Sequence, residues 1–414
     1  MKTNKLGTST IALLSLTLAS LSGHAESEKT APNHLTVHEW GTFTSLQGSD
    51  GVVQQGLQHE EESLPAFVHG RDPLHEPQPG APAGRPPGCR GKCLEFGTLA
   101  NTPLAVTQKM ETPVLYFYSN AAQHVDIGVR FPQGIISQYY PNPVDFSPAI
   151  GGVSSLSGGS VKFSVDVVKN AITPPVVEPT SIYAPARNTK ADSVVSGSES
   201  ERMIFYRGVG NFIAATQVTS KEGGIQIHNT GNERLSAVFL LNVTQDGGSI
   251  LPLGGLAGQG NLNVGASEVS RLQGHSSPFS SLLPFAGGLL KKALESSGLY
   301  ADESQAMVDT WKRSYFKNPG LRVIYILSRE ETDRILPISV QPQPDSLVRT
   351  LVGRIEVVLD TEEQALLKAI HEQKEQFDVS TLGRFGEAKL RRLAQITPDW
   401  NEQNTIQTLL TKFP

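Results

Sequence analysis

The sequence predicts a mainly β protein of the α+β class, with a β-sandwich-like antiparallel core, inserted helices and a C-terminal helical tail. Two observations carry this prediction. Short segments rich in aromatic and β-branched residues recur between residues 35 and 360, separated by Gly, Asn and Pro. After residue 360 the apolar residues change to the spacing of three and four that is typical of helices. We therefore divide the mature chain into a sandwich-like domain, residues 35–360, and a helical tail, residues 361–414.

The first 25 residues are typical of a signal peptide. Lys2 and Lys5 provide a positively charged start, the apolar run IALLSLTLASL is too short to cross a bilayer, and SGHA places small residues before a cleavage site. We expect the mature protein to begin near Glu26, with residues 26–34 as a disordered lead-in. No second long apolar run follows. The sequence thus predicts a periplasmic or secreted protein without a transmembrane segment.

The charge of the chain argues against binding to nucleic acid. The full sequence has 35 Lys and Arg against 40 Asp and Glu, a net charge of −5. Removing the leader takes away two lysines and no acid, which leaves −7. A protein that binds the phosphate backbone or an anionic membrane needs a basic stripe to offset such an excess of acid, and the sequence shows none.

The expected strands are short and mostly alternate between apolar and polar residues. A hairpin is predicted from 112–119 and 124–131, joined by NAAQ, with the alternate residues from Val125 to Phe131 on one face. The segment 321–327, LRVIYIL, has apolar residues on both faces and should be a covered, central strand. The other strands are expected at 35–43, 161–168, 203–208, 212–218, 224–229, 235–243, 334–342 and 347–360.

Loops and helices complete the expected architecture. Two long loops rich in Pro, Gly and Ser are predicted at 70–92 and 170–201. A helical insertion is predicted at 285–317, where one stripe should contact the core: Met307, Trp311 and Tyr315. In the tail the first helix is expected to begin with a capping box of Thr361 and Gln364.

Cys89 and Cys93 lie in the loop sequence PPGCRGKCLEF. In an oxidising compartment two nearby cysteines are typical of a small disulfide that closes a local loop. The flanking Arg90 and Lys92 leave open a reactive thiolate or a soft-metal site, because nearby positive charge lowers the pKa of a thiol. Three residues separate the cysteines instead of the two found in the usual redox and zinc signatures, so we favour the disulfide.

Histidines concentrate near the start of the mature chain. Five of the nine that remain after cleavage lie within residues 34–75, together with several carboxylates. Imidazole and carboxylate are the ligand types of Zn and similar divalent metals. The candidate ligands are His38, His59, His69 and His75. No fixed ligand spacing such as H-E-x-x-H is present, so an exposed polar loop and a metal-free acid/base or sugar-binding site remain open alternatives.

Glu39 occupies a position in the first expected strand where a hydrophobic residue belongs. In an extended chain Glu39 shares a face with Val37 and Phe43, whereas His38 and Trp40 lie on the other face. A buried carboxylate requires a positive partner or a proton. Glu39 is therefore either ion-paired with an arginine of a neighbouring strand or a catalytic acid or base in a cleft, with His38 and Trp40 as binding residues. The candidate arginines are Arg130, Arg322, Arg349 and Arg354.

The chain resembles exported bacterial proteins that share the motif H-E-W-G-T-F-T. The resemblance covers most of the mature chain and rests on VHEWGTFTS (37–45), METPVLYFY (110–118), FYRGVGNF (205–212), AMVDTWKRSYF (306–316) and LVGRIEV (351–357). It implies export, and it implies that His38, Glu39 and Trp40 occupy a position that matters. It implies no activity, cofactor or catalytic residue.

Two classes of function remain. The sequence contains no complete catalytic set, so the leading prediction is a periplasmic or envelope-associated binding module that holds a glycan, a peptide or an envelope protein. The alternative is a metal-dependent hydrolase that uses the N-terminal His and Glu cluster with Zn or another divalent metal. A serine hydrolase is disfavoured because no G-x-S-x-G motif occurs.

Overall fold

Strand β1 (Leu35–Gln47) is the strand around which the fold is organised, and all of its residues are buried. In the computed structural model, residues 34–57, 64–70, 105–148, 155–169, 172–312 and 314–413 are described, and they belong to one compact unit, Asn33–Pro414. The predicted strand at 35–43 is confirmed and extends four residues further. The predicted leader 1–25, His59, His75, Cys89 and Cys93 lie outside the described residues.

Three sheets contain the described strands, and the predicted fold class is confirmed as mainly β with helices. The largest sheet runs in the order β17 (Ser277–Pro278), β15 (Gly247–Leu256), β14 (Leu235–Val243), β18 (Gly320–Ile326), β20 (Ser346–Val357), β1, β3 (Gln108–Met110), β11 (Ile204–Gly210), β6 (Gly134–Tyr140) and β2 (His69–Gly70), and β4 (Val114–Ser119) pairs with β1 and β11. The second sheet runs in the order β10 (Glu199–Glu201), β9 (Ser193–Ser196), β8 (Gly159–Val168), β5 (Gln123–Phe131) and β19 (Ile338–Gln341), and β7 (Asp145–Ser147) pairs with β8. The third consists of β12 (Thr216–Lys221), β13 (Gly224–Asn229) and β16 (Asn261–Val264).

Helices lie on the large sheet and form the tail. Their bounds are α1 (Ala266–Gly274), α2 (Phe279–Ser296), α3 (Ala301–Trp311), α4 (Arg329–Ile335), α5 (Asp360–Gln373), α6 (Gly386–Ile396) and α7 (Trp400–Leu410), with short 3-10 helices η1 (Ala184–Arg187), η2 (Lys374–Gln376) and η3 (Val379–Phe385). None of the helices in the described ranges is long and apolar enough to cross a membrane.

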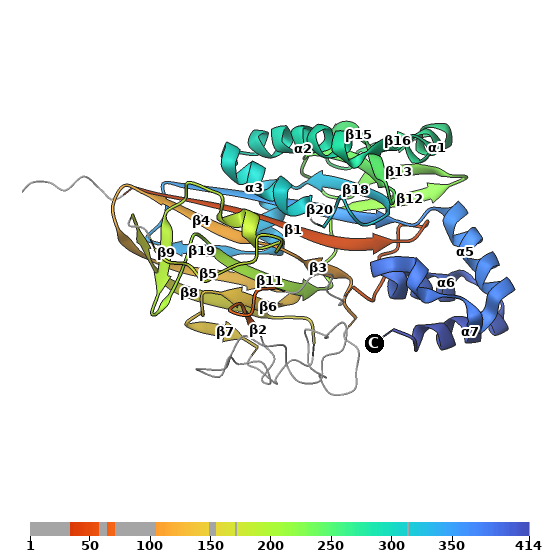
Figure 1. Cartoon of the computed structure of the whole chain (residues 1–414), viewed down its shortest axis with the longest axis horizontal. Helices are drawn as coiled ribbons and strands as arrows, with labels where there is room; N and C mark the ends of the chain where they lie inside the picture. The colour runs from red at the N-terminus through yellow and green to blue at the C-terminus, as the bar shows by residue number, and fades with distance from the viewer. Residues whose placement is uncertain are drawn as a thin grey trace, which may run out of the picture. The chain divides into compact units, whose positions relative to one another are not determined.

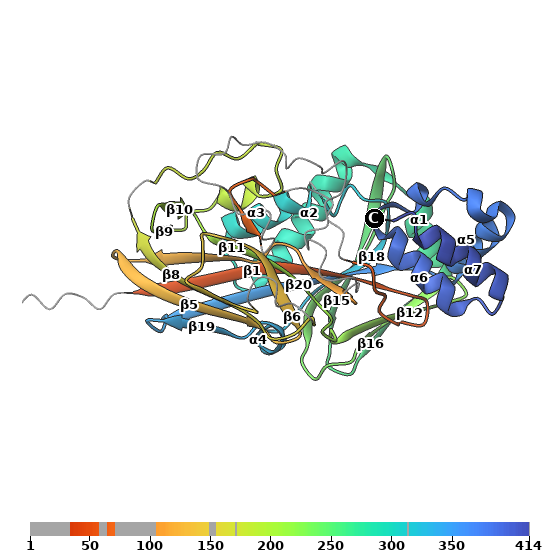
Figure 2. The ribbon, with the colours of Figure 1, turned by 90° about the horizontal axis from the view of Figure 1, so that it is seen from below.

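Two apolar cores lie on opposite faces of the large sheet. One core includes Val37 and Phe43 of β1 together with residues of the two smaller sheets, such as Val129. The other includes Trp40 of β1 and residues of α2 and α3, such as Leu290. Figures 1 and 2 show α2 and α3 on one side of β1 and β20, and β5 and β8 on the other. Because side chains alternate along a strand, Val37 and Phe43 of β1 enter the sandwich core and Trp40 enters the helix-covered core, whereas Leu46 packs in a third cluster with Phe385.

The parallel pairing of β1 with β20 brings together the first strand of the described chain and the last. Thr36 to Gln47 pair in register with Ser346 to Val357, and all other pairings among the described strands are antiparallel. Strand β18 lies between β14 and β20 and is almost wholly buried, so the prediction of a covered central strand at 321–327 is confirmed.

The predicted hairpin of 112–119 with 124–131 is wrong. Strand β4 pairs with β1 and β11 in the large sheet, whereas β5 pairs with β8 and β19 in the second sheet. Both edges of each strand are thus occupied by other strands, and the short link between them crosses from one sheet to the other. The predicted apolar face is confirmed, since the alternate residues from Val125 to Phe131 are all buried.

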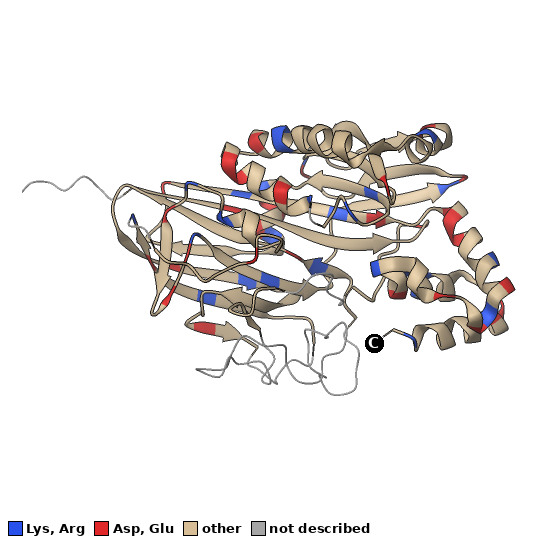
Figure 3. Cartoon of the chain, in the orientation of Figure 1, with Lys and Arg blue, Asp and Glu red and all other residues tan. Residues whose placement is uncertain are grey.

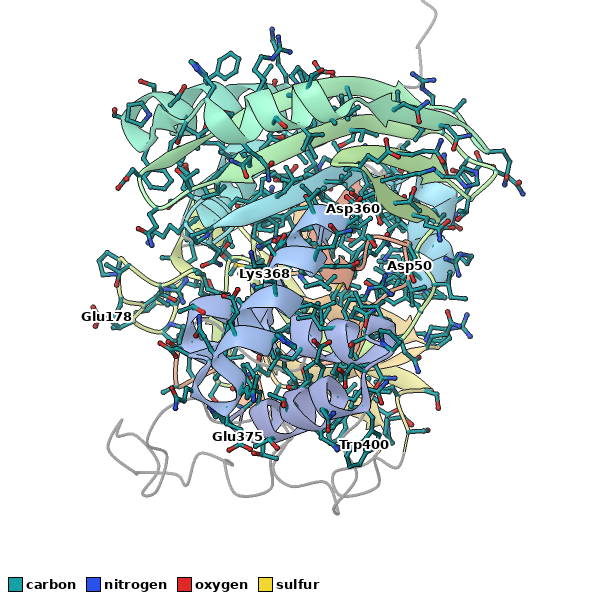
Figure 4. The ribbon with its side chains drawn as sticks, turned by 90° about the vertical axis from the view of Figure 1, so that its right-hand side faces the viewer. Asp50, Glu178, Asp360, Lys368, Glu375 and Trp400 are labelled. Carbon is teal, nitrogen blue, oxygen red and sulfur yellow. The ribbon has the colours of Figure 1, made fainter. Side chains whose placement is uncertain are left out.

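Two further local predictions are corrected by the structure. The expected strand at 334–342 begins as the end of helix α4, and only Ile338–Gln341 is strand. The expected capping box of Thr361 and Gln364 is absent, because Leu359 is the N-cap and α5 begins at Asp360, which places Thr361 inside the first turn. The Asp360 carboxylate instead accepts hydrogen bonds from the backbone N–H groups of Glu222 and Gly223, which joins the tail to the third sheet. Figure 4 shows Asp360 where α5 meets this sheet.

The helical tail has its own small core and is attached to the sheet by ion pairs. Ile370, Leu393 and Ile406 come from its three helices and pack together. Arg392 of α6 bonds Glu363 of α5 at 2.7 Å and also pairs with Asp50, which follows β1. These contacts fix the tail at the carboxyl end of β1.

Candidate binding pocket

Glu39 belongs to a buried ion pair, as the first interpretation of the sequence predicts. Its Oε2 accepts a hydrogen bond from Nε of Arg349 at 2.6 Å, and the two residues are direct partners in the register of β1 and β20. Its Oε1 accepts a hydrogen bond from the Tyr206 hydroxyl at 2.5 Å. Burial and the charge of Glu39 raise the pKa of Tyr206 well above its usual value, so the phenol stays a donor. Both carboxylate oxygens are thus engaged.

Arg349 extends this network to helix α4. Its Nη1 donates hydrogen bonds to the carboxylate of Asp333 at 2.5 Å and to the carbonyl of Leu336 at 2.7 Å. Figure 3 shows Lys and Arg on the strands of the sheets as well as on the helices. Buried charges of this kind are tolerated when their hydrogen bonds are satisfied. We interpret the Glu39–Arg349–Tyr206 network as structural.

His38 and Trp40 face the helices, on the side of β1 opposite to Glu39. His38 Nδ1 lies 2.8 Å from Oε2 of Glu303 in α3, and the hydroxyl of Tyr118 donates to the other oxygen of the same carboxylate at 2.7 Å. The Tyr300 ring covers the imidazole at 4.4 Å between centroids. Trp40 is fully buried in the helix-covered core. The two side chains are therefore close to one another in sequence but have separate environments.

The remaining candidate metal ligands do not meet in the described part of the chain. His69 Nε2 lies 2.6 Å from Oε1 of Glu199, so His69 and His38 have different carboxylate partners. His59 and His75 fall outside the described residues. Within the described ranges no three His, Cys, Asp or Glu side chains are grouped as a metal would require. The metal site remains a prediction.

A pocket opens on the helix side of β1, three residues beyond Glu39. Its cavity volume is about 20 Å³, and the empty space is about 380 Å³ when the open mouth is included. We name it the α3–η3 pocket, because α3 and η3 bring two of its walls to the sheet. It is lined by Thr42, Glu111, Thr112, Ile182, Arg207, Thr310, Trp311, Ser314, Tyr315 and Arg384.

The carboxylate of this pocket is held ionised by its neighbours. Glu111 forms an ion pair with Arg384 of η3, and its backbone carbonyl accepts a hydrogen bond from Nε of Arg207 at 2.7 Å. Burial raises the pKa of Glu111, but the positive charges of Arg384 and Arg354 and a hydrogen bond from Tyr315 outweigh it and lower the pKa to about 2. Glu111 is therefore ionised at neutral pH.

Aromatic rings form a second wall, and an arginine lies against it. The rings of Trp311 and Tyr315 are stacked, with 5.6 Å between centroids and 8° between planes. The guanidinium carbon of Arg354 lies 4.1 Å from the centroid of the Tyr315 ring, which is a cation–π contact. The prediction that Trp311 and Tyr315 contact the core is confirmed, but both also line the pocket.

Sequence reasoning missed this pocket, although its residues lay in the segments that were singled out. Four of the five segments on which the resemblance rests line it directly, through Thr42, Glu111, Arg207 and Trp311, among others. The fifth segment supplies Arg354, behind Tyr315. One signal in the sequence is the presence of arginines in apolar strand-like segments, as with Arg207 and Arg354.

The low pKa of Glu111 makes a testable contribution to stability. A carboxyl group whose pKa is lower in the folded state stabilises the fold above its unfolded pKa, and this contribution is lost as the pH falls from about 4.5 to about 2. We expect Glu111→Gln to be less stable than the wild type by about 3 kcal/mol at pH 6, and the difference to narrow toward pH 2. Urea unfolding followed at a series of pH values measures it.

The matched control is Glu178→Gln, which removes a carboxylate from an exposed loop; Figure 4 shows this side chain pointing away from the protein. Its unfolding curve should follow the wild type at every pH. A constant offset between Glu111→Gln and the wild type, from pH 6 down to pH 2, would show that the Glu111 carboxylate is not held ionised.

Comparisons with known proteins give only weak structural likeness. No protein-family model matches the chain, and no curated protein sequence matches it. It is similar to the Fcho1 mu homology domain of Danio rerio with bound Eps15 peptide, at a TM-score of 0.30 and 7% identity over 79% of this chain and 97% of that chain. It is also similar to the yeast delta-COP-I mu-homology domain complexed with Dsl1 WxWxV peptide, at a TM-score of 0.24 and 9% identity over 80% of this chain and 98% of that chain. At these TM-scores neither structure supports an inference about the pocket.

Proposed function

We propose that the protein is an exported binding module that takes a small ligand in the α3–η3 pocket. The proposal of export rests on the leader-like residues 1–25 and on the resemblance to exported proteins. The proposal of binding rests on the pocket itself. The single observation that carries it is the convergence of segments far apart in the chain, from β1, β11, α3 and η3, on one concave site with both polar and aromatic walls.

The chemistry of the lining supports binding over acid/base catalysis. Its lone carboxylate among the described residues, Glu111, already pairs with Arg384 and accepts from Tyr315. A carboxylate with a pKa near 2 is a poor base at neutral pH, because catalysis favours a pKa close to the working pH. The lining does contain what recognition requires, namely hydroxyl groups, guanidinium groups and flat rings.

A ligand screen with a pocket-filling variant tests the proposal. Ser314 lines the pocket, so Ser314→Leu should fill it. The matched control is Ser296→Leu, an exposed serine at the end of α2. Thermal unfolding is followed with a panel of neutral sugars, amino acids, dipeptides and small acids. We expect at least one class to stabilise the wild type and Ser296→Leu, by about 3 kcal/mol at a concentration of 100 times Kd, and to leave Ser314→Leu unchanged.

Two results would contradict the proposal. In the first, no compound of the panel stabilises the wild type. In the second, every compound that stabilises the wild type stabilises Ser314→Leu equally, which would place binding elsewhere on the protein.

A further inference from the structure

We propose that the group recognised in the α3–η3 pocket is a carboxylate, carried either by the C-terminus of a peptide or by an acidic sugar. This inference rests on the proposed binding function and adds the chemical class of the ligand.

A buried donor at the pocket wall has no acceptor within the described chain. Trp311 lines the pocket and is 1% exposed, yet its indole Nε1–H has no hydrogen-bond partner among the described residues. The neighbouring hydroxyls are engaged in the helix, since Thr310 donates to the carbonyl of Ala306 at 3.0 Å and Ser314 to that of Thr310 at 3.4 Å. An unsatisfied buried donor destabilises the protein, and a ligand oxygen that accepts from Trp311 would remove that cost.

A buried arginine behind the pocket wall also has hydrogen-bond donors without an acceptor among the described residues. Arg354 is fully buried, and its Nε donates to Oε1 of Glu356 at 2.5 Å. Its two terminal nitrogens, Nη1 and Nη2, have no hydrogen-bond partner in the described ranges. Its charge acts on Glu111 and Tyr315, both of which line the pocket. A buried arginine with two unused nitrogens attracts an anion, because its charge is poorly screened there.

Two arginines and one carboxylate line the pocket among the described residues. Glu111 is the one carboxylate among the described lining residues, and its charge is shared with Arg384. Arg207 also lines the pocket and holds the Glu111 backbone in place through its carbonyl. An incoming negative group thus meets two arginines at the wall and a third behind it.

The size of the pocket separates a carboxylate from other anions. A cavity of about 20 Å³ holds about one or two atoms of the size of a water oxygen. The two oxygens of a carboxylate match this space, whereas a phosphate group has four oxygens around its phosphorus. A neutral amide has a similar shape but lacks the charge that the arginines require.

Acetate, acetamide and phosphate are the probes that test the ligand class. Binding to the mature protein is measured by calorimetry and by thermal unfolding, at constant ionic strength maintained with sodium chloride. We expect acetate to bind, acetamide to bind at least tenfold more weakly, and phosphate to have no effect beyond that of chloride. Phosphate binding as tight as that of acetate, or equal binding of acetate and acetamide, overturns the inference.

A matched pair of tryptophan variants places the bound group. Trp311→Phe keeps a ring in the wall and removes the Nε1–H donor, so we expect acetate affinity to fall at least tenfold. Trp40→Phe makes the same change in the core, at a residue that does not line the pocket, and should leave affinity unchanged. Unchanged affinity in Trp311→Phe, with normal unfolding, overturns the inference.

Further pairs of compounds identify the source of the carboxylate. They also test the proposed binding function separately from the carboxylate inference. Glycylglycine is compared with its amide, and glucuronate with glucose. Preference for glycylglycine indicates a peptide C-terminus, and preference for glucuronate indicates an acidic sugar. If only the neutral member of a pair binds, and Ser314→Leu abolishes that binding, the carboxylate inference fails while the binding function stands. If Ser314→Leu changes the binding of none of these compounds, the carboxylate inference and the proposed binding function both fail.

Discussion

Replacing Glu39 by alanine is expected to lower the free energy of unfolding by about 3–5 kcal/mol, because it leaves the charge of Arg349 buried without its main partner. The Tyr206 hydroxyl, which donates to the same carboxylate, loses its acceptor as well. Asp333 would still contact Arg349, but it is partly exposed at the end of the network. Urea unfolding monitored by circular dichroism measures the loss.

A double variant distinguishes the free-energy cost of leaving one charge unpaired from the net contribution of the ion pair to stability. Glu39→Met combined with Arg349→Met replaces both charges with apolar side chains, and it should recover a substantial part of the stability lost in Glu39→Ala. If Glu39→Ala stays within 1 kcal/mol of the wild type, the carboxylate is not part of a buried ion pair, and our interpretation of the network as structural fails.

Replacing Trp40 by alanine should cost about 3–5 kcal/mol as well, on the opposite face of the same strand. Trp40 is fully buried and packs in the core that joins the large sheet to α2 and α3, close to the ring of Tyr116. Removing the indole leaves a cavity beneath the helices, which a rigid strand that is paired on both edges closes poorly. Chemical unfolding with a tryptophan-independent signal is the appropriate measurement.

Trp40→Phe serves as the control for this prediction, since it keeps an aromatic ring in the core and should cost clearly less than the alanine variant. A role of Trp40 in binding would produce the reverse pattern, with a stable Trp40→Ala protein that loses affinity. That outcome would return the site to His38, Glu39 and Trp40.

The sequence predicted β1 well because its alternation is unambiguous. A charged residue at an odd position between Val37 and Phe43 required a buried partner, and Arg349 was among four candidate arginines. Selecting it needed the register of two strands whose paired residues are 310 positions apart, and no local pattern encodes that register. The hairpin prediction is wrong for the same reason: β4 and β5 are adjacent in sequence, but they pair with distant strands in different sheets.

The α3–η3 pocket could not be predicted, although most of its residues were visible. Thr42 and Trp311 each fit a structural role in their own segment, as a strand polar residue and a core ring, and Arg207 is not among the four candidate partners of Glu39. Only the tertiary arrangement brings them together. The histidine cluster is visible in the sequence because its polar residues lie close together along the chain, whereas the residues of the pocket come together only in the folded structure.

The parallel ladder between β1 and β20 has a consequence for how the chain folds. One edge of β1 stays unpaired until residues 346–357 have emerged, so the large sheet cannot be completed before most of the chain has been synthesised. Contacts between such distant segments raise the relative contact order and slow folding. Early, incomplete chains would expose an unprotected apolar edge, which makes aggregation the main hazard for truncated forms.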